Sequence, residues 1–179
     1  TVYGPDKKAL DAELDAAVNE ITRLENLFSV NIASSEISKI NSSDRGAGVG
    51  AETAAIITEA LRIAGETDGA FDPTIEPIVK LWGIATDHPR VPGKGEIEGA
   101  LPLVDYRRVS VSGGNVSKGT GQKLDLGGIA KGWIADRLSD KLRADGIKSA
   151  LIDLGGNLSV VGESSERRAW RLGLQRPSS

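Results

Sequence analysis

The sequence contains no cysteine and no methionine, and it has a single histidine. Without cysteine there is no disulfide, no thiolate nucleophile and no metal site with cysteine ligands. The lack of cysteine favours neither an oxidising nor a reducing compartment, because such a chain suits both equally. A basic surplus is also lacking, since 22 basic side chains stand against 25 acidic ones, giving a net charge of −3. Proteins that bind nucleic acid usually carry such a surplus, so we expect no nucleic-acid partner.

Long apolar runs are missing as well. Charged residues interrupt the apolar stretches every few positions, and no run approaches the roughly twenty residues that cross a bilayer. The 179 residues, 39% hydrophobic and 26% charged, suffice for one sizeable core or two small ones. This composition excludes the disordered, collagenous and disulfide-stapled classes.

The missing methionine bears on the ends of the chain. Translation starts with methionine, so Thr1 is not a natural start unless a segment was removed. The chain opens on the strand-like Thr1-Val2-Tyr3 and stops at Ser179 just after another strand-like run. We therefore expect a fragment or a processed chain, in which the lack of a visible signal peptide says nothing about export.

Hydrophobic periodicity predicts the elements. Three long helices are expected at 6–28, 51–64 and 129–144, the last two closed by Gly65 and Gly146. Shorter helices are expected at 35–40, 75–82 and 96–103, and loops at 44–50 and 83–95. Strands are expected at 108–112, 115–118, 123–126, 149–154, 158–161 and 170–174, with Gly113-Gly114 as a hairpin turn. Helices that precede strands, with one helix inserted, predict an α+β fold over a single domain, residues 1–179, with the helices packed on a mostly antiparallel sheet.

The strongest local signal for chemistry is Asp125-Leu126-Gly127-Gly128-Ile129-Ala130-Lys131-Gly132, where a predicted strand ends and a helix begins. The unpaired N–H groups and partial positive charge of a helix N-terminus suit a phosphate, and Lys131 adds a full charge. Asp125 is placed to accept from a ribose, a base or a metal-bound water. The spacing is neither that of a Walker A loop nor Gly-x-Gly-x-x-Gly. The alternative is a purely structural turn with a solvated lysine.

A second candidate is Gly69-Ala70-Phe71-Asp72-Pro73. A residue before proline is held extended, so the Asp72 carboxylate has a fixed direction and is suited to line a pocket. The alternative is a turn or capping aspartate, with Phe71 in the core.

A third candidate is Ile152-Asp153-Leu154-Gly155-Gly156-Asn157. Small residues at a strand end let a flat ligand or another backbone lie close, although an ordinary hairpin turn has the same pattern. His88, in a loop with prolines and no partner, is interpreted as a surface residue, which leaves no support for a Ser/His/Asp triad. No His/Asp/Glu cluster has zinc spacing.

Taken in order along essentially the whole chain, these motifs resemble the FAD:protein FMN transferases, the ApbE-like flavin transferases. The resemblance rests on the first helix with its end Arg23-Leu24-Glu25-Asn26-Leu27-Phe28-Ser29, on Ser35-Glu36-Ile37-Ser38, on Asp68-Gly69-Ala70-Phe71-Asp72-Pro73 with Leu81-Trp82-Gly83, on Val104-Asp105-Tyr106-Arg107, and on the two Asp-Leu-Gly-Gly segments.

The resemblance implies a flavin transferase-like fold and a defined reaction. Such an enzyme binds FAD with Mg²⁺, cleaves the pyrophosphate and moves FMN onto a threonine or serine of an acceptor protein, releasing AMP; hydrolysis of FAD is a related activity. This is phosphoryl transfer, in which positioning and charge neutralisation supply most of the catalysis. The residues implied as FAD contacts are Ala70, Phe71, Asp72, Asp125 and Lys131, with Gly155 and Gly156 beside the flavin and the Gly128 carbonyl as a metal ligand.

Departures from the family pattern lie at both ends. The family begins upstream with a methionine-containing strand and continues downstream through the magnesium carboxylate and the general base. We therefore expect a domain incomplete at both ends, catalytic residues downstream of Ser179, and weak or no transferase activity from this chain alone. The alternative is a non-catalytic flavin- or nucleotide-binding module that needs a second chain. The family also implies a location in the cell envelope, often as a lipoprotein, through an anchor that this sequence does not include.

Overall fold

The computed structural model describes residues 1–84, 86–164, 166 and 168–173. Contacts group the chain into two compact units. The central unit is Arg23–Ala130, and the terminal unit combines Thr1–Thr22 with the described residues from Lys131 onward. The single domain expected over 1–179 stays a prediction.

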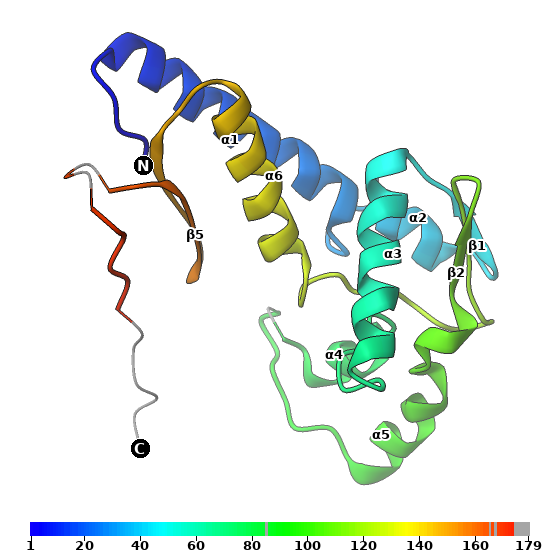
Figure 1. The fold of residues 1–179 in the computed structure, drawn as a ribbon. Coiled ribbons are helices and arrows are strands. Elements are labelled where there is room, and N and C mark those ends of the chain that lie inside the picture. The colour runs from blue at the N-terminus through cyan, green and yellow to red at the C-terminus, as the bar shows by residue number, and fades with distance from the viewer. Residues whose placement is uncertain (85, 165, 167, 174–179) are drawn as a thin grey trace. The chain divides into compact units, whose positions relative to one another are not determined.

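The central unit contains a small antiparallel sheet at one edge, with helices beside it (Figure 1). The sheet has the order β1-β3-β2, with Ala47 and Val111 both opposite Val116 in the register. The last residues of α1 (Lys7–Phe28) belong to this unit. Its other elements are α2 (Glu36–Ser42), β1 (Gly46–Gly48), α3 (Ala51–Glu66), α4 (Glu76–Trp82), α5 (Lys94–Ala100), the 3-10 turns η1 (Leu101–Leu103) and η2 (Tyr106–Arg108), β2 (Ser110–Ser112) and β3 (Asn115–Ser117).

Glycine geometry explains how this sheet forms. Gly113 and Gly114 have φ angles of 55° and 76°, the left-handed pair that a two-residue hairpin needs, so the predicted β2–β3 hairpin is confirmed. The prediction of a loop over 44–50 is wrong in part, because β1 lies within it. Gly46 lies so close to β3 that a Cβ there would be 1.9 Å from the Val116 carbonyl oxygen. A strand of Gly-Ala-Gly carries no alternating pattern that sequence reasoning can detect.

Apolar side chains from three helices, a strand and two connecting segments form the core of the central unit. Fully buried Leu, Ile and Phe side chains each contribute on the order of 1.5–3 kcal/mol. Ser35 caps α2, accepting the N–H of Ser38 at 2.9 Å. The buried apolar residues are Leu24 and Phe28 on α1, Ile37 and Ile40 on α2, Ile56, Ile57, Ala60 and Ala64 on α3, and Val109, Val116, Leu124 and Leu126 beyond them.

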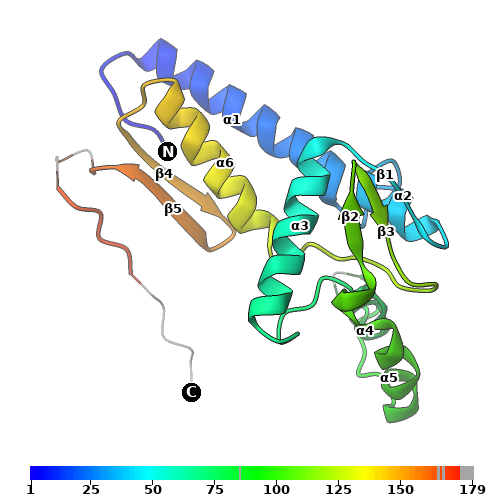
Figure 2. The same cartoon turned by 45° about the vertical axis from the view of Figure 1, so that its right-hand side comes forward.

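The terminal unit contains Lys7–Thr22 of α1, the helix α6 (Ala130–Ala144) from Lys131 onward, and the antiparallel strands β4 (Ser149–Leu154) and β5 (Asn157–Gly162). α6 runs beside α1, and the β4–β5 hairpin lies beside α6 (Figure 2). The hydroxyls of Ser139 and Ser159 are 3.0 Å apart, joining α6 to β5. Val2 bridges Ala150, so the N-terminal residues cover the free edge of β4. The apolar core is Ile134, Ala135, Leu138, Leu142, Ala150, Ile152 and Val161.

These helices and antiparallel strands confirm the α+β class. The strands form two sheets among the described residues rather than one. Gly146, with a φ of 82°, follows α6 as predicted. The predicted C-cap at Gly65 is wrong, because α3 continues to Glu66. The predicted strand at 170–174 is wrong for 170–173, which have no strand partner, and Leu174 lies outside the described residues.

One smaller prediction also changes. The strand expected at 108–112 is shorter, because η2 takes its first residue. No helix within the described ranges is both long and apolar enough to span a membrane.

Candidate functional site

The turn after α3 carries the Gly-Ala-Phe-Asp-Pro motif. Asp68 and Gly69 have φ angles of 49° and 80°, so the chain reverses through two left-handed residues. The Gly69 N–H donates to a carbonyl in the last turn of α3 at 2.8 Å, and the Phe71 N–H donates to Thr67 Oγ1 at 3.1 Å. These bonds fix the turn and leave Ala70 exposed on it.

Asp72 uses its carboxylate inside the protein. Oδ1 accepts the N–H and the hydroxyl of Thr74 at 2.8 and 2.7 Å, and Oδ2 accepts the N–H of Tyr106 at 3.0 Å. Three of about four acceptor positions of the carboxylate are therefore occupied. Asp72 thus orders this turn, as the structural alternative for the motif predicts, and a ligand would meet only its remaining acceptor position.

The second motif forms a compact turn before α6. Asp125 Oδ1 accepts the N–H of Gly127 at 2.7 Å, an arrangement typical of aspartate at turns. The N–H groups of Ile129 and Ala130 both donate to the Leu126 carbonyl, at 2.9 and 2.8 Å. Several N–H groups that the sequence offered to a phosphate are thus used within the turn. Gly127 and Gly128 are themselves exposed.

The structure brings these two motifs into contact within the central unit. The Asp125 N–H donates to the Pro73 carbonyl at 2.8 Å. The ring of Phe71 lies against Gly128, where a Cβ would come within 3.0 Å of Phe71 Cε2. Two segments more than fifty positions apart in the sequence therefore form one surface.

The strand predicted at 123–126 is wrong, and a side chain explains why. The amide of Asn41 donates to the Leu124 carbonyl at 2.8 Å and accepts the Leu124 N–H at 2.7 Å. One asparagine thus provides both hydrogen bonds that a neighbouring strand would have supplied. The segment has no regular secondary structure and is anchored without belonging to a sheet.

The remaining predicted residues lie in the terminal unit. Lys131 is exposed in the first turn of α6, and its Nζ would be 3.9 Å from a Cβ on Gly155. Gly155 and Gly156 form the β4–β5 turn with φ angles of 63° and 89°, and the Gly156 N–H donates to Asp153 Oδ1 at 2.8 Å. The hairpin that the sequence offered as an alternative is present, and it lies next to the Lys131 ammonium.

Comparison with known families decides the membership of the chain. The sequence model of the ApbE family matches residues 1–179. The chain belongs to the ApbE family.

Its relatives agree with this placement. Proteins named FAD:protein FMN transferase are 37% identical in Klebsiella pneumoniae (88% of this chain, 49% of that protein), 34% in Treponema pallidum (93% and 52%) and 30% in Vibrio cholerae (97% and 52%). The chain spans about half the length of these curated relatives.

Solved structures show the same fold. The ApbE protein of Thermotoga maritima superposes with a TM-score of 0.87 at 32% identity, covering 94% of this chain and 57% of that one. The flavin transferase ApbE of Vibrio cholerae gives 0.83 at 30% identity, covering 97% and 57%. The predicted flavin transferase-like fold is confirmed.

The residues of this ApbE chain provide only part of the predicted magnesium site. A backbone carbonyl such as that of Gly128 is an oxygen ligand of the kind that Mg²⁺ accepts. In the part of the chain that the structure describes, however, no three His, Cys, Asp or Glu side chains gather in a group that could hold a metal. Any Mg²⁺ at Gly128 would take further oxygen ligands from elsewhere, such as substrate phosphates and water.

Sequence reasoning missed the polar residues that support this ApbE site. Thr74 and Asn41 bind the motif segments, whereas Gln122 binds the segment at Leu103 and Asp105. Thr74 and Gln122 are fully buried. Thr74 follows an Asp-Pro pair, a pattern typical of turns in which the aspartate bonds to the residue two positions on, so it could have been found. Gln122 and Asn41 act on residues distant in sequence and give no local signal.

His88 lies exposed in its loop, as interpreted from the sequence.

Proposed function

We propose that the two contacting motifs form part of the FAD site of a FAD:protein FMN transferase. The observation that carries the proposal is the contact between them, through the Asp125–Pro73 hydrogen bond and the Phe71–Gly128 packing. Both motifs lie in the part of the chain that the sequence model of the ApbE family matches. The activity, substrates and partners of the whole protein are part of this proposal, because the chain spans about half of those relatives.

The chain's own residues would bind and orient FAD. The exposed Ala70 and the ring of Phe71 offer a small apolar surface beside the exposed Gly128. Lys131 would place a positive charge near the pyrophosphate, at the positive end of the α6 dipole. Asp125 would hold the Gly127 turn in place and present its second oxygen to a ribose hydroxyl or a metal-bound water. The resemblance implies that Gly155 and Gly156 lie beside the flavin.

In the proposed reaction an acceptor hydroxyl, of threonine or serine, forms a bond to the FMN phosphorus as the pyrophosphate bond to AMP breaks. The hydroxyl proton passes to a general base, and AMP leaves. Bound Mg²⁺, with Gly128 among its ligands, would supply charge neutralisation at the phosphates. Transfer of the same phosphorus to water would be FAD hydrolysis.

We also propose partners and a location for the full-length protein. The partners would be FAD and a flavin-acceptor protein, with no nucleic acid. The full-length protein would act in the cell envelope, attached as a lipoprotein, which fractionation of cells producing it would test.

Titration with FAD tests the proposal. We expect the chain to quench FAD fluorescence saturably in the presence of Mg²⁺, and Lys131→Ala to raise the Kd about tenfold, as loss of a charge-assisted contact does. Lys8→Ala, which removes another exposed lysine from the first turn of a helix, should leave the Kd unchanged. Equal effects of the two variants, or no saturable quenching by the wild-type chain, would contradict the proposed site.

A second titration separates the two roles of Asp125. Asp125→Asn keeps an acceptor for the Gly127 N–H but loses the charge, whereas Asp125→Ala loses both. We expect both variants to weaken FAD binding if the charge faces the ligand or its metal. Weakening by Asp125→Ala alone would assign Asp125 to the turn only. The alternative function, a binding module without catalysis, predicts the same affinities but no AMP release when a complete enzyme is assayed with an acceptor protein.

A further inference from the structure

Gln122 is a fully buried amide whose hydrogen bonds all end on backbone groups. Its Nε2 donates to the Asp105 carbonyl at 2.8 Å and to the Leu103 carbonyl at 3.2 Å. Its Oε1 accepts the N–H of Gly119 at 2.8 Å. One side chain therefore ties the 103–105 segment to the segment that leads into the second motif.

The segment held by Gln122 supports the first motif. The Asp105 N–H donates to Thr74 Oγ1 at 2.8 Å, and the Tyr106 N–H donates to Asp72 Oδ2 at 3.0 Å. The Tyr106 ring also lies 3.6 Å from where a Cβ on Gly69 would be. The 105–106 segment thus touches the Gly69–Asp72 turn at both of its ends.

We propose that Gln122 is a positioning residue of the FAD site, fixing the Ala70–Asp72 turn through the 103–106 segment. This inference rests on the proposed function for its effect on FAD. It explains why a polar side chain occupies a fully buried position that an aliphatic residue could otherwise fill. Gln122 binds the carbonyls of Leu103 and Asp105. The N–H groups of Asp105 and Tyr106 in turn bind Thr74 and Asp72.

The chemistry of the site requires an amide at position 122. A buried carbonyl left without a donor is unfavourable, and only a side chain with two N–H donors and an acceptor satisfies all three groups. Glutamate has the same length but cannot donate when ionised, and methionine fills the volume with no hydrogen bond. Both substitutions free the 103–106 segment while keeping the core approximately filled.

Two measurements on the same variants test the proposal. The first is the Kd for FAD, measured at a temperature where circular dichroism shows each variant folded. The second is amide hydrogen exchange at Thr74 and Tyr106, whose N–H groups both bond to Asp72. For Gln122→Met we expect a Kd raised about tenfold, the usual effect of removing a residue that holds the binding residues in place. We also expect faster hydrogen exchange at both amides. Ile37→Val, which trims a fully buried side chain of α2 outside the network, should lower the melting temperature without either change.

Thr74 provides a second route if Gln122→Met does not fold. Thr74→Val removes the hydroxyl that accepts from Asp105 and should reproduce both effects, whereas Thr74→Ser retains the hydroxyl and should restore wild-type behaviour. Wild-type Kd and exchange in Gln122→Met and in Thr74→Val would overturn the proposal. If the wild-type chain fails to bind FAD, the proposed function falls. The hydrogen-exchange measurement then tests the positioning role by itself. Unchanged protection of the Thr74 and Tyr106 amides in the variants would overturn that role.

Discussion

The ring of Phe71 rests on Gly128, with so little space between them that a Cβ on Gly128 would lie 3.0 Å from Phe71 Cε2. This contact joins the two motifs that carry the proposed function. We predict that Gly128→Ala displaces the Phe71 ring and lowers the free energy of unfolding by about 1–2 kcal/mol, the usual range for mild overpacking. Urea denaturation measures the change, and FAD affinity should fall with it.

Gly65→Ala is the matched control for this glycine. Gly65 lies inside α3 with no atom within 4 Å of the position a Cβ would take. Alanine there should stabilise the helix by about 0.5–1 kcal/mol, because glycine is the poorer helix former. If both glycine variants shift stability in the same direction, the space between Phe71 and Gly128 is wide enough for a Cβ, and the account of this contact is wrong.

Asn41 should be among the most sensitive polar positions. Asn41→Ala leaves both the N–H and the carbonyl of Leu124 without their partner, and the buried segment that carries Asp125 loses its anchor. We predict a loss of about 2–4 kcal/mol in the free energy of unfolding, as expected for two unsatisfied backbone groups. Asn115→Ala, on an exposed strand position, should stay within about 0.5 kcal/mol of wild type. Similar small effects at both sites would show that another group anchors Leu124.

Glu96 gives a test in pH. The guanidinium of Arg90 and the Gly93 N–H, which both donate to this carboxylate, lower the pKa of Glu96 from 4.5 to about 2. Because the pKa is depressed in the folded chain, the stabilisation is present above pH 4.5 and is lost as the pH falls through about 2. Carboxyl NMR titration should show this midpoint.

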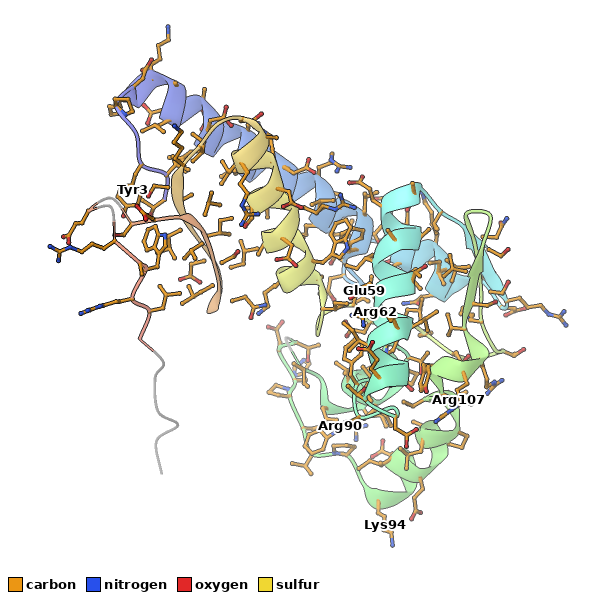
Figure 3. All side chains as sticks on the ribbon, viewed as in Figure 1. Tyr3, Glu59, Arg62, Arg90, Lys94 and Arg107 are labelled. Atoms are coloured by element: carbon orange, nitrogen blue, oxygen red, sulfur yellow. The ribbon has the colours of Figure 1, made fainter. Side chains whose placement is uncertain are left out.

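Variants at two labelled side chains control that titration (Figure 3). Arg90→Ala should raise the Glu96 midpoint toward its ordinary value, since the ion pair is removed. Lys94→Ala removes a neighbouring lysine that pairs with Glu98 and should leave the midpoint in place. A Glu96 midpoint that does not respond to Arg90→Ala would contradict the assigned cause.

Lys118 should oppose folding at neutral pH. Its residue is only 7% exposed, and burial lowers the pKa of its amino group from 10.5, with Lys123 adding to the effect and Asp44 opposing it. The unfolded chain then holds this proton at pH values where the folded chain releases it, so stability rises with pH between the lowered pKa of the folded chain and 10.5, the pKa of the unfolded chain. We predict that Lys118→Met raises the melting temperature at pH 7 and removes that rise. Lys39→Met, at an exposed position of α2, should do neither.

Local patterns in the sequence predicted much of the fold. The periodicity of α1 and α6, the Ser35 cap and the Gly113-Gly114 turn are local features, so their structures follow from neighbouring residues. The structure of residues 123–126 could not be predicted, because Asn41, more than eighty positions away, replaces a strand partner. β1 escaped prediction because its three small residues have no pattern of their own.

In the candidate site, too, local features were predicted and contacts between distant segments were not. The motif residues Asp72 and Asp125 were identified from the sequence, but their hydrogen-bond partners were not. The structure shows that both carboxylates accept from nearby backbone amides, Asp72 from Thr74 and Tyr106 and Asp125 from Gly127. Whether a carboxylate serves a ligand or its own turn depends on partners such as Tyr106, which lie in another segment. The role of each aspartate in FAD binding stays a prediction.

The most direct test of the central claim is an NMR titration of the ¹⁵N-labelled chain with FAD in the presence of Mg²⁺. We predict saturable shifts at the amides of Ala70, Phe71, Gly127 and Gly128 together, because the two motifs form one surface. Riboflavin and AMP, titrated separately, should each shift only part of this set. Shifts confined to one motif, or none at an excess of FAD, would contradict the account.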